Sequence, residues 1–236
     1  MPRVVITGVG TGVGKTHVAC ALARALAPHG RTVALKPIET GYTKHEGSDA
    51  DALERAALHA KHPHPAVTAA APTSLAAAAG APSAPLELSA IAAWVDEQEH
   101  YTTSHYTIIE TPGGLLSPLD ARTTNLELAA HLRPAVTLLI APNRLGCLHA
   151  VAAALAAFRD AGATTPWIVL TSPGAPDAST VTNPDLLRAR HPLTPVYVLG
   201  PRDAGPDAAA DLAAALRSRL DGARAGASPP PPPARY

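Results

Sequence analysis

Short apolar runs rich in β-branched residues alternate along the chain with longer alanine-rich segments that repeat at helical spacing. The apolar runs predict strands at 3–7, 32–36, 106–110, 135–140, 167–170 and 196–199. The segments between them predict helices at 15–27, 49–61, 89–100, 125–132, 145–161 and 207–220. Nearly continuous apolar strands separated by helices are typical of an α/β fold, in which a mostly parallel sheet carries helices on both faces. Ligands of such a sheet bind at the carboxyl ends of its strands, where Gly8, Lys36, Glu110 and Ala141 fall.

The same pattern predicts one domain over residues 1–220. Beyond it the sequence turns to Gly, Ala and Ser and then to consecutive prolines, so we expect 221–236 to be a disordered, proline-rich tail. Segment 62–85 is rich in Ala and Pro and predicts an extended loop beside a substrate site.

Charge and cysteine content narrow the choice of partners. The formal net charge is zero and the Lys and Arg residues are scattered, which disfavours nucleic acid and an anionic membrane surface and favours small molecules. No segment is apolar for the length of a membrane span, and the N-terminus does not resemble an export signal. Cys20 and Cys147 are too few for a disulfide framework, so we expect a reduced, cytoplasmic setting.

The sequence Gly-Val-Gly-Thr-Gly-Val-Gly-Lys-Thr, from Gly8 to Thr16, joins the first predicted strand to the first predicted helix. A glycine-rich loop in that setting is typical of a phosphate-binding P-loop, whose backbone N–H groups surround the phosphates. Lys15 adds a positive charge and Thr16 a hydroxyl ligand for Mg²⁺. The usual spacing places the first glycine at Val9, so this loop is one residue longer when counted from Gly8.

Charged side chains mark two further strand ends. Lys36 ends the second predicted strand, and Glu110 ends the third just before Thr-Pro-Gly-Gly, where a second ligand for a P-loop Mg²⁺ is expected. Asp49 opens a helix after Gly-Ser, and its position fits either a metal ligand or a helix cap. Asp51 lies equally close, so spacing alone leaves both interpretations open.

The sequence Arg-Leu-Gly-Cys-Leu-His at 144–149 follows the strand at 135–140 and begins another predicted helix. Its N-terminus is a second place where an anion can bind. His149 on its own favours packing or capping over metal coordination.

These motifs, in this order, resemble those of the ATP-dependent dethiobiotin synthetases of biotin biosynthesis. That family has a loop Gly-Thr-x-Thr-x-Val-Gly-Lys-Thr, then Lys-Pro-x-x-[Ser/Thr]-Gly, an Asp, Glu-x-x-Gly-Gly, and Leu-Gly-[Cys/Thr]-[Ile/Leu]-[Asn/His]-His. This chain has the loop at 8–16, Lys-Pro-Ile-Glu-Thr-Gly at 36–41, Asp49, Glu-Thr-Pro-Gly-Gly at 110–114 and Leu-Gly-Cys-Leu at 145–148.

The resemblance implies a P-loop NTPase-like fold and a ligase that joins CO₂ to 7,8-diaminononanoate, phosphorylates the carbamate from ATP and closes a cyclic urea. By the same resemblance Lys15 and Lys36 are catalytic, and Thr16, Asp49 and Glu110 bind Mg²⁺. The residues implied to contact the nucleotide are Thr11, Gly12, Val13, Gly14, Lys15, Thr16, His17, Glu110, Thr111, Pro112 and Gly113. Those implied to contact the substrate are Thr40 and, from the other subunit of a homodimer, Gly146, Cys147, Leu148 and His149.

Three segments depart from the family's pattern, one of them at 144–149, where Arg144 replaces the Lys of some relatives and His149 stands where they have Asn followed by His. Thr171-Ser172 stand where relatives read adenine with Asn-Asp, and a hydroxyl does not offer the paired donor and acceptor of an amide. We therefore expect CTP, GTP or UTP to replace ATP in part. Relatives also carry Pro-x-Ser-Pro-His after the second helix, whereas residues 72–76 read Pro-Thr-Ser-Leu-Ala.

Three other interpretations fit a P-loop chain of this kind. A partner-regulated ATPase of the chromosome-partitioning type places a second Lys early in the loop, where this chain has Gly10. A cobyrinate-type amidotransferase carries a glutaminase domain with a nucleophilic Cys, and no Cys follows residue 200 here. A nucleotide-binding scaffold without activity also fits, because of the departures at 72–76 and 171–172.

Overall fold

Six parallel strands form one sheet at the centre of the computed structural model, which describes residues 2–39, 48–58, 87–172, 174–200 and 209–226. The strands occur in the order β2-β3-β1-β4-β5-β6. Their bounds are β1 Arg3–Gly8, β2 Thr32–Leu35, β3 Tyr106–Glu110, β4 Val136–Pro142, β5 Trp167–Thr171 and β6 Val196–Val198. The α/β fold with a parallel sheet is thereby confirmed.

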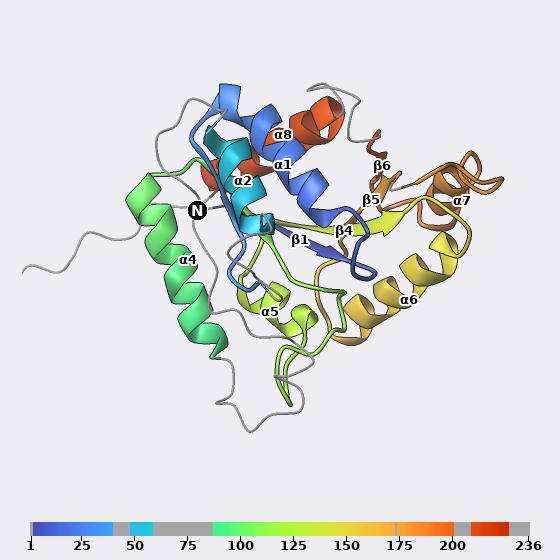
Figure 1. Cartoon of the computed structure of the whole chain (residues 1–236), viewed down its shortest axis with the longest axis horizontal. Helices are drawn as coiled ribbons and strands as arrows, with labels where there is room; N and C mark the ends of the chain where they lie inside the picture. Colours follow the sequence, from blue (N-terminus) through green and yellow to red (C-terminus); the bar gives the residue numbers. More distant parts are fainter. Residues whose placement is uncertain (1, 40–47, 59–86, 173, 201–208, 227–236) are drawn as a thin grey trace, which may run out of the picture.

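Helices cover both faces of the sheet (Figure 1). On one face lie α1 Lys15–Leu26, α2 Asp49–Leu58 and α8 Ala210–Gly226. On the other lie α4 Leu88–Thr102, α5 Asn125–His131 and α6 Cys147–Asp160. The short 3₁₀ helix η1 Ala27–His29 follows α1, and α7 Asn183–Arg190 packs against α6 and β6.

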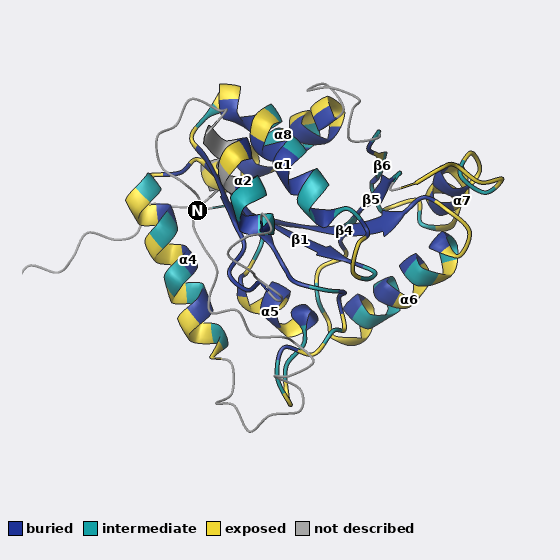
Figure 2. Ribbon diagram, in the orientation of Figure 1, coloured by how far each residue is buried: buried dark blue, intermediate teal, exposed yellow. Residues whose placement is uncertain are grey.

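The apolar character of the strands follows from this two-sided cover. All seven residues of β4 are buried, because alternate side chains enter different cores. Leu138 and Ile140 join the cluster that includes α1 and α8, while Leu139 and Ala141 join the cluster that includes α6 and α7. Figure 2 shows the buried strands between helices whose outer sides are exposed.

The strand order places the predicted site residues beside the carboxyl end of β1. Both neighbours of β1 come from later in the chain, with Ile6 paired to Glu110 of β3 and Gly8 paired to Ile140 of β4. Because the strands are parallel, the carboxyl ends of β1, β2 and β3 meet at one edge of the sheet. The end of β3 is therefore brought next to the loop that follows β1.

Several boundaries differ from the sequence-based expectation. The helix expected at 145 begins at Cys147, because Gly146 adopts a left-handed conformation (φ 89°) at its N-cap. The structure adds α7, a helix that the sequence analysis does not predict. Helix α8 continues to Gly226, past the expected domain end at 220. Segment 62–85 and residues 227–236 lie outside the described residues.

Both cysteines are buried and unpaired with each other. Burial raises the pKa of Cys20 and of Cys147 to about 11, so neither thiol supplies a thiolate at neutral pH. Among the described residues, no helix has the length and apolarity needed to cross a bilayer.

Candidate functional site

The P-loop at residues 8–16 has the backbone that its glycines allow. Gly14 has φ 95° and Gly12 φ 70°, conformations that residues with a Cβ rarely adopt. A Cβ on Gly14 would also lie 3.2 Å from the side chain of Thr171. The loop then turns directly into α1 at Lys15, so the free N–H groups of that helix face the site.

Two lysine ammonium groups are buried at this site. Lys15, on α1, donates to the carbonyl of Gly10 at 3.0 Å. Lys36, just after β2, donates to Glu110 Oε1 at 2.8 Å and also pairs with Asp49. Burial lowers the pKa of Lys15. Burial also acts to lower the pKa of Lys36, but attraction to Glu110 and Asp49 outweighs it and leaves the pKa raised, so this ammonium keeps its proton.

Asp49 is the first residue of α2 and is not its cap. Ser48 holds the cap position: its hydroxyl accepts the N–H of Asp51 at 2.9 Å, and the Asp51 carboxylate accepts the N–H of Ser48 at 2.9 Å. The Asp49 carboxylate is free to face Lys36 instead. Burial acts to raise the pKa of Asp49, but the opposing effects of Lys36 and Thr16 are larger. The pKa is therefore lowered from its usual value, and the carboxylate is ionised.

Glu110 is fully buried at the end of β3. Its Oε1 accepts hydrogen bonds from Lys36 and, at 2.9 Å, from the Thr16 hydroxyl. Its Oε2 has no hydrogen-bond partner among the described residues. Burial raises the pKa of Glu110, against the opposing effect of Lys36. A buried carboxylate oxygen without a partner is costly unless a ligand completes it.

These side chains line one pocket of about 290 Å³. Its lining residues are Thr11, Gly12, Gly14, Lys15, Thr16, His17, Lys36, Glu39, Asp49, Glu110, Pro112 and Gly113. Most of the residues expected to contact the nucleotide are therefore together. Val13 lines a neighbouring pocket of about 420 Å³ instead. The Thr111 hydroxyl donates to the carbonyl of Ile6, and Thr40 lies outside the described residues.

The donor set fits Mg²⁺. The Thr16 hydroxyl donates to the Glu110 carboxylate, and Asp49 is joined to Glu110 through Lys36 and interacts directly with Thr16. Glu110 Oε2 has no hydrogen-bond partner among the described residues. No group of three or more His, Cys, Asp or Glu side chains in the described part of the chain could hold a metal ion by itself. That is the pattern of Mg²⁺ sites in which one or two carboxylates act with substrate phosphates and water.

The loop after β3 lies against the P-loop. Leu115 N donates to the carbonyl of Gly8 at 2.7 Å, and a Cβ on Gly114 would come within 3.0 Å of the Cα of Gly10. The amide of Asn125, which is fully buried at the start of α5, donates to the carbonyls of Pro112 and Gly114. The sequence analysis assigns Asn125 no role, because its contacts are with main-chain atoms 11 and 13 residues earlier in the chain, which the fold brings near it.

Thr171, at the end of β5, is hydrogen-bonded to the backbone of the P-loop. Its buried hydroxyl donates to the carbonyl of Val13 at 2.6 Å and approaches that of Ala141 at 3.4 Å. The Thr171 hydroxyl therefore donates its proton to the main chain and not to a nucleotide base. Ser172 lines the neighbouring pocket with Asn143 and Arg144.

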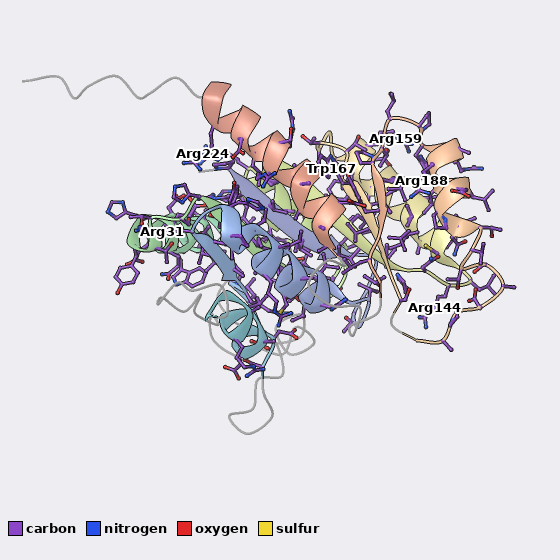
Figure 3. All side chains as sticks on the ribbon, turned by 90° about the horizontal axis from the view of Figure 1, so that it is seen from above. Arg31, Arg144, Arg159, Trp167, Arg188 and Arg224 are labelled. Atoms are coloured by element: carbon purple, nitrogen blue, oxygen red, sulfur yellow. The ribbon has the colours of Figure 1, made fainter. Side chains whose placement is uncertain are left out.

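The start of α6 lies apart from the phosphate pocket. Gly146 and His149 are exposed, Cys147 is buried, and none of the residues 146–149 lines the pocket. The preceding loop is held by segment 177–183: Leu145 N donates to Asp177 at 2.7 Å, and Asn183 donates to Asn143 Oδ1 at 3.1 Å. Figure 3 shows Arg144 near this end of the molecule, with Arg159 and Arg188, and Arg31 and Arg224 at the opposite end.

The chain is similar to known proteins both in sequence and in structure. Residues 2–201 match a protein family described as an AAA domain (AAA_26). The ATP-dependent dethiobiotin synthetase BioD of Anaeromyxobacter dehalogenans is 38% identical over 183 residues, which are 75% of this chain and 79% of that protein. The BioD of Saccharopolyspora erythraea is 38% identical over 238 residues, which are 97% of this chain and 96% of that protein.

Solved structures share the fold at much lower identity. The hydrogenase maturation factor HypB from Archaeoglobus fulgidus has a TM-score of 0.57 at 15% identity, covering 93% of this chain and 90% of that one. A ParA family ATPase from Chlorobium tepidum has a TM-score of 0.50 at 14% identity, covering 96% and 95%. At such identities the likeness establishes the P-loop NTPase-like fold alone.

Proposed function

The chain belongs to the family of ATP-dependent dethiobiotin synthetases, which are ligases, and from that premise we propose how its own residues carry out the reaction. The proposed substrates are ATP, CO₂ and 7,8-diaminononanoate. The observation that carries the proposal is the convergence of Lys15, Thr16, Lys36, Asp49 and Glu110, from four separate segments, in one pocket.

The proposed sequence of bonds has three steps. One amine of the substrate attacks CO₂, which forms a carbamate and releases a proton. A carbamate oxygen then attacks the γ-phosphorus of ATP, and ADP leaves with the electrons of the broken P–O bond. Finally the second amine attacks the carbamoyl carbon and loses a proton, and phosphate leaves with the electrons of the broken C–O bond, which closes the five-membered cyclic urea.

The chain contributes position and charge to these steps. The P-loop amides and Lys15 would bind the β- and γ-phosphates, and Lys36 would bring the carbamate oxygen and the phosphoryl group together. Because its pKa is raised, Lys36 stays a cation while negative charge spreads over the transferring group. It serves as an electrostatic group rather than as a proton donor.

Mg²⁺ would be held by Thr16, Asp49 and Glu110, and it would neutralise charge on the phosphate oxygens. Glu110 Oε2, which has no hydrogen-bond partner in the part of the chain that the structure describes, supports this assignment. Thr40 would contact the diamine or the carbamate.

A homodimer is the proposed assembly, because residues 146–149 lie outside the chain's own pocket and would bind the carboxylate of a substrate held by the other subunit. The proposed setting is the cytoplasm, where thiols such as those of Cys20 and Cys147 stay reduced. The zero formal net charge and the scattered Lys and Arg residues favour these small molecules over nucleic acid or a membrane as partners.

The test is product formation by the purified chain with ATP, Mg²⁺, ¹³C-bicarbonate and 7,8-diaminononanoate. We expect a cyclic urea that carries one ¹³C, detected by mass, together with ADP. Lys15→Ala is the matched control and should bind ATP weakly and form little product. ATP hydrolysis that does not depend on the diamine would favour a partitioning-type ATPase. Absence of product with ATP, CTP, GTP and UTP alike would favour an inactive scaffold.

A further inference from the structure

Glu39 is a buried carboxylate in the phosphate pocket for which the proposed reaction has no role. It is 5% exposed, follows β2 by a few residues and lines the pocket with Lys15, Lys36, Asp49 and Glu110. A carboxylate is seldom buried so far without a specific partner. Its partners therefore show what it does.

Both Glu39 oxygens accept backbone N–H groups at the start of α2. Oε1 accepts from Asp49 N at 2.6 Å, and Oε2 accepts from Ala50 N at 3.2 Å. The first N–H groups of a helix have no partner inside the helix, and the helix dipole favours a negative charge beside them. Glu39 thus occupies, from within the chain, a position where a free anion would otherwise bind.

A separate cap already stabilises the same helix end. Ser48 and Asp51 bond each other reciprocally, as described above, and do not use the N–H groups of Asp49 or Ala50. Helix capping is therefore provided by Ser48. Glu39 adds a hydrogen-bonded connection between the segment after β2 and the first residue of α2.

That first residue is Asp49, whose side chain is 46% exposed and whose pairing among the described residues is with Lys36 and Thr16. The direction in which the Asp49 side chain points depends on the position of the Asp49 backbone. We propose that Glu39 is a positioning residue, which fixes the backbone of Asp49 so that the Asp49 carboxylate faces the Mg²⁺ position. The inference rests on the proposed role of Asp49 as a metal ligand.

The test compares Mn²⁺ binding by Glu39→Gln and Ser48→Ala, measured by electron paramagnetic resonance in the presence of a non-hydrolysable ATP analogue. Gln keeps the size of Glu39 but places an amide donor against N–H groups, so we expect Mn²⁺ affinity to fall about fivefold, the scale of one lost hydrogen bond. Ser48→Ala removes a cap from the same helix end and should lower the melting temperature but leave Mn²⁺ affinity unchanged. If Glu39→Gln does not fold, Glu39→Ala carries the same test, because it removes both acceptors without placing a donor against the N–H groups.

Asp49→Asn serves as the benchmark. Weaker Mn²⁺ binding in Asp49→Asn and Glu39→Gln, with Ser48→Ala unchanged, supports the inference. Normal binding in Glu39→Gln beside weak binding in Asp49→Asn overturns it and leaves the proposed metal site intact. Equal losses in Glu39→Gln and Ser48→Ala reduce Glu39 to a helix-stabilising role and also overturn it. Normal binding in Asp49→Asn overturns the metal role of Asp49 itself, and the inference with it.

Discussion

The two ends of the sheet each bury a cluster of charges, and the clusters differ in how completely they are paired. At the amino end, Arg3 of β1 donates to Glu99 of α4 through two hydrogen bonds of 2.9 Å, and also to Asp96 and to the carbonyl of Leu132. At the carboxyl end, Lys36 bridges two carboxylates, and one oxygen of Glu110 has no partner among the described residues.

The difference distinguishes a charge cluster that stabilises the fold from one that can bind a ligand. The Arg3 cluster directs each guanidinium nitrogen to an acceptor and joins β1, α4 and the turn after α5. The Lys36 cluster opens into a pocket of about 290 Å³ beside the P-loop, with a second ammonium on Lys15. An incompletely paired buried cluster at such a pocket is the arrangement expected of a site that a ligand completes.

The largest expected effect is on stability, at the amino end. Arg3→Met leaves Glu99 buried without its cation, so the free energy of unfolding should fall by about 3–5 kcal/mol. Denaturant unfolding measures this, and kcat of the folded protein should stay near the unsubstituted value. A large loss of kcat with normal stability would contradict the division between the two ends.

Lys36→Ala should produce the converse result. Removal of one charge aimed at the transferring phosphoryl group should lower kcat at least a hundredfold, or about 3 kcal/mol. Steady-state kinetics beside a thermal melt separates this loss from unfolding. Turnover near that of the unsubstituted chain would exclude Lys36 from the mechanism.

The metal ligands should show a smaller, conditional effect. Asp49→Asn and Glu110→Gln each remove an anionic oxygen, so the Mg²⁺ concentration for half-maximal activity should rise about tenfold. Since Ser48 caps α2, Asn at position 49 does not disturb the cap. Titration of activity with Mg²⁺ measures the effect, and an unchanged dependence in both variants would remove these residues from the metal site.

The smallest expected effect concerns the base. The Thr171 hydroxyl is bonded to the main chain, and Ser172 lacks the paired donor and acceptor of an amide. CTP, GTP or UTP should therefore support the reaction within about tenfold of ATP, a gap of about 1.4 kcal/mol. The measurement is kcat/KM for the four triphosphates at saturating diamine. A preference for ATP above about a hundredfold would show that other groups, such as those after Gly200, read adenine.

Site residues could be predicted from the sequence when the residue type and its immediate neighbours indicate what the residue binds. The P-loop, Lys36 and Glu110 could be found because each follows an apolar strand, and parallel strands bring their ends together. Glu39 and Asn125 could not, because each acts on main-chain groups that only the folded chain brings near. The spacing of Asp49 fitted cap and ligand equally well until the structure showed Ser48 in the cap position.

The fold followed the same division. The buried strands were predicted within one or two residues, because two-sided burial imposes a continuous apolar run. Helix α7 was missed because it is short and begins with Asn-Pro in a polar segment. The start of α6 was placed two residues early, since helical spacing does not show that Gly146 takes a left-handed conformation.

The central claim is that the pocket at the carboxyl end joins a carbamate to the γ-phosphate of ATP. The direct measurement supplies ¹⁸O-labelled bicarbonate with 7,8-diaminononanoate, Mg²⁺ and ATP, and follows the isotope into inorganic phosphate before the label exchanges with water. Because a carbamate oxygen attacks phosphorus and leaves with it, each turnover should place one ¹⁸O in phosphate and one in the cyclic urea. Unlabelled phosphate would show that water, and not a carbamate, attacks ATP, and would contradict the account.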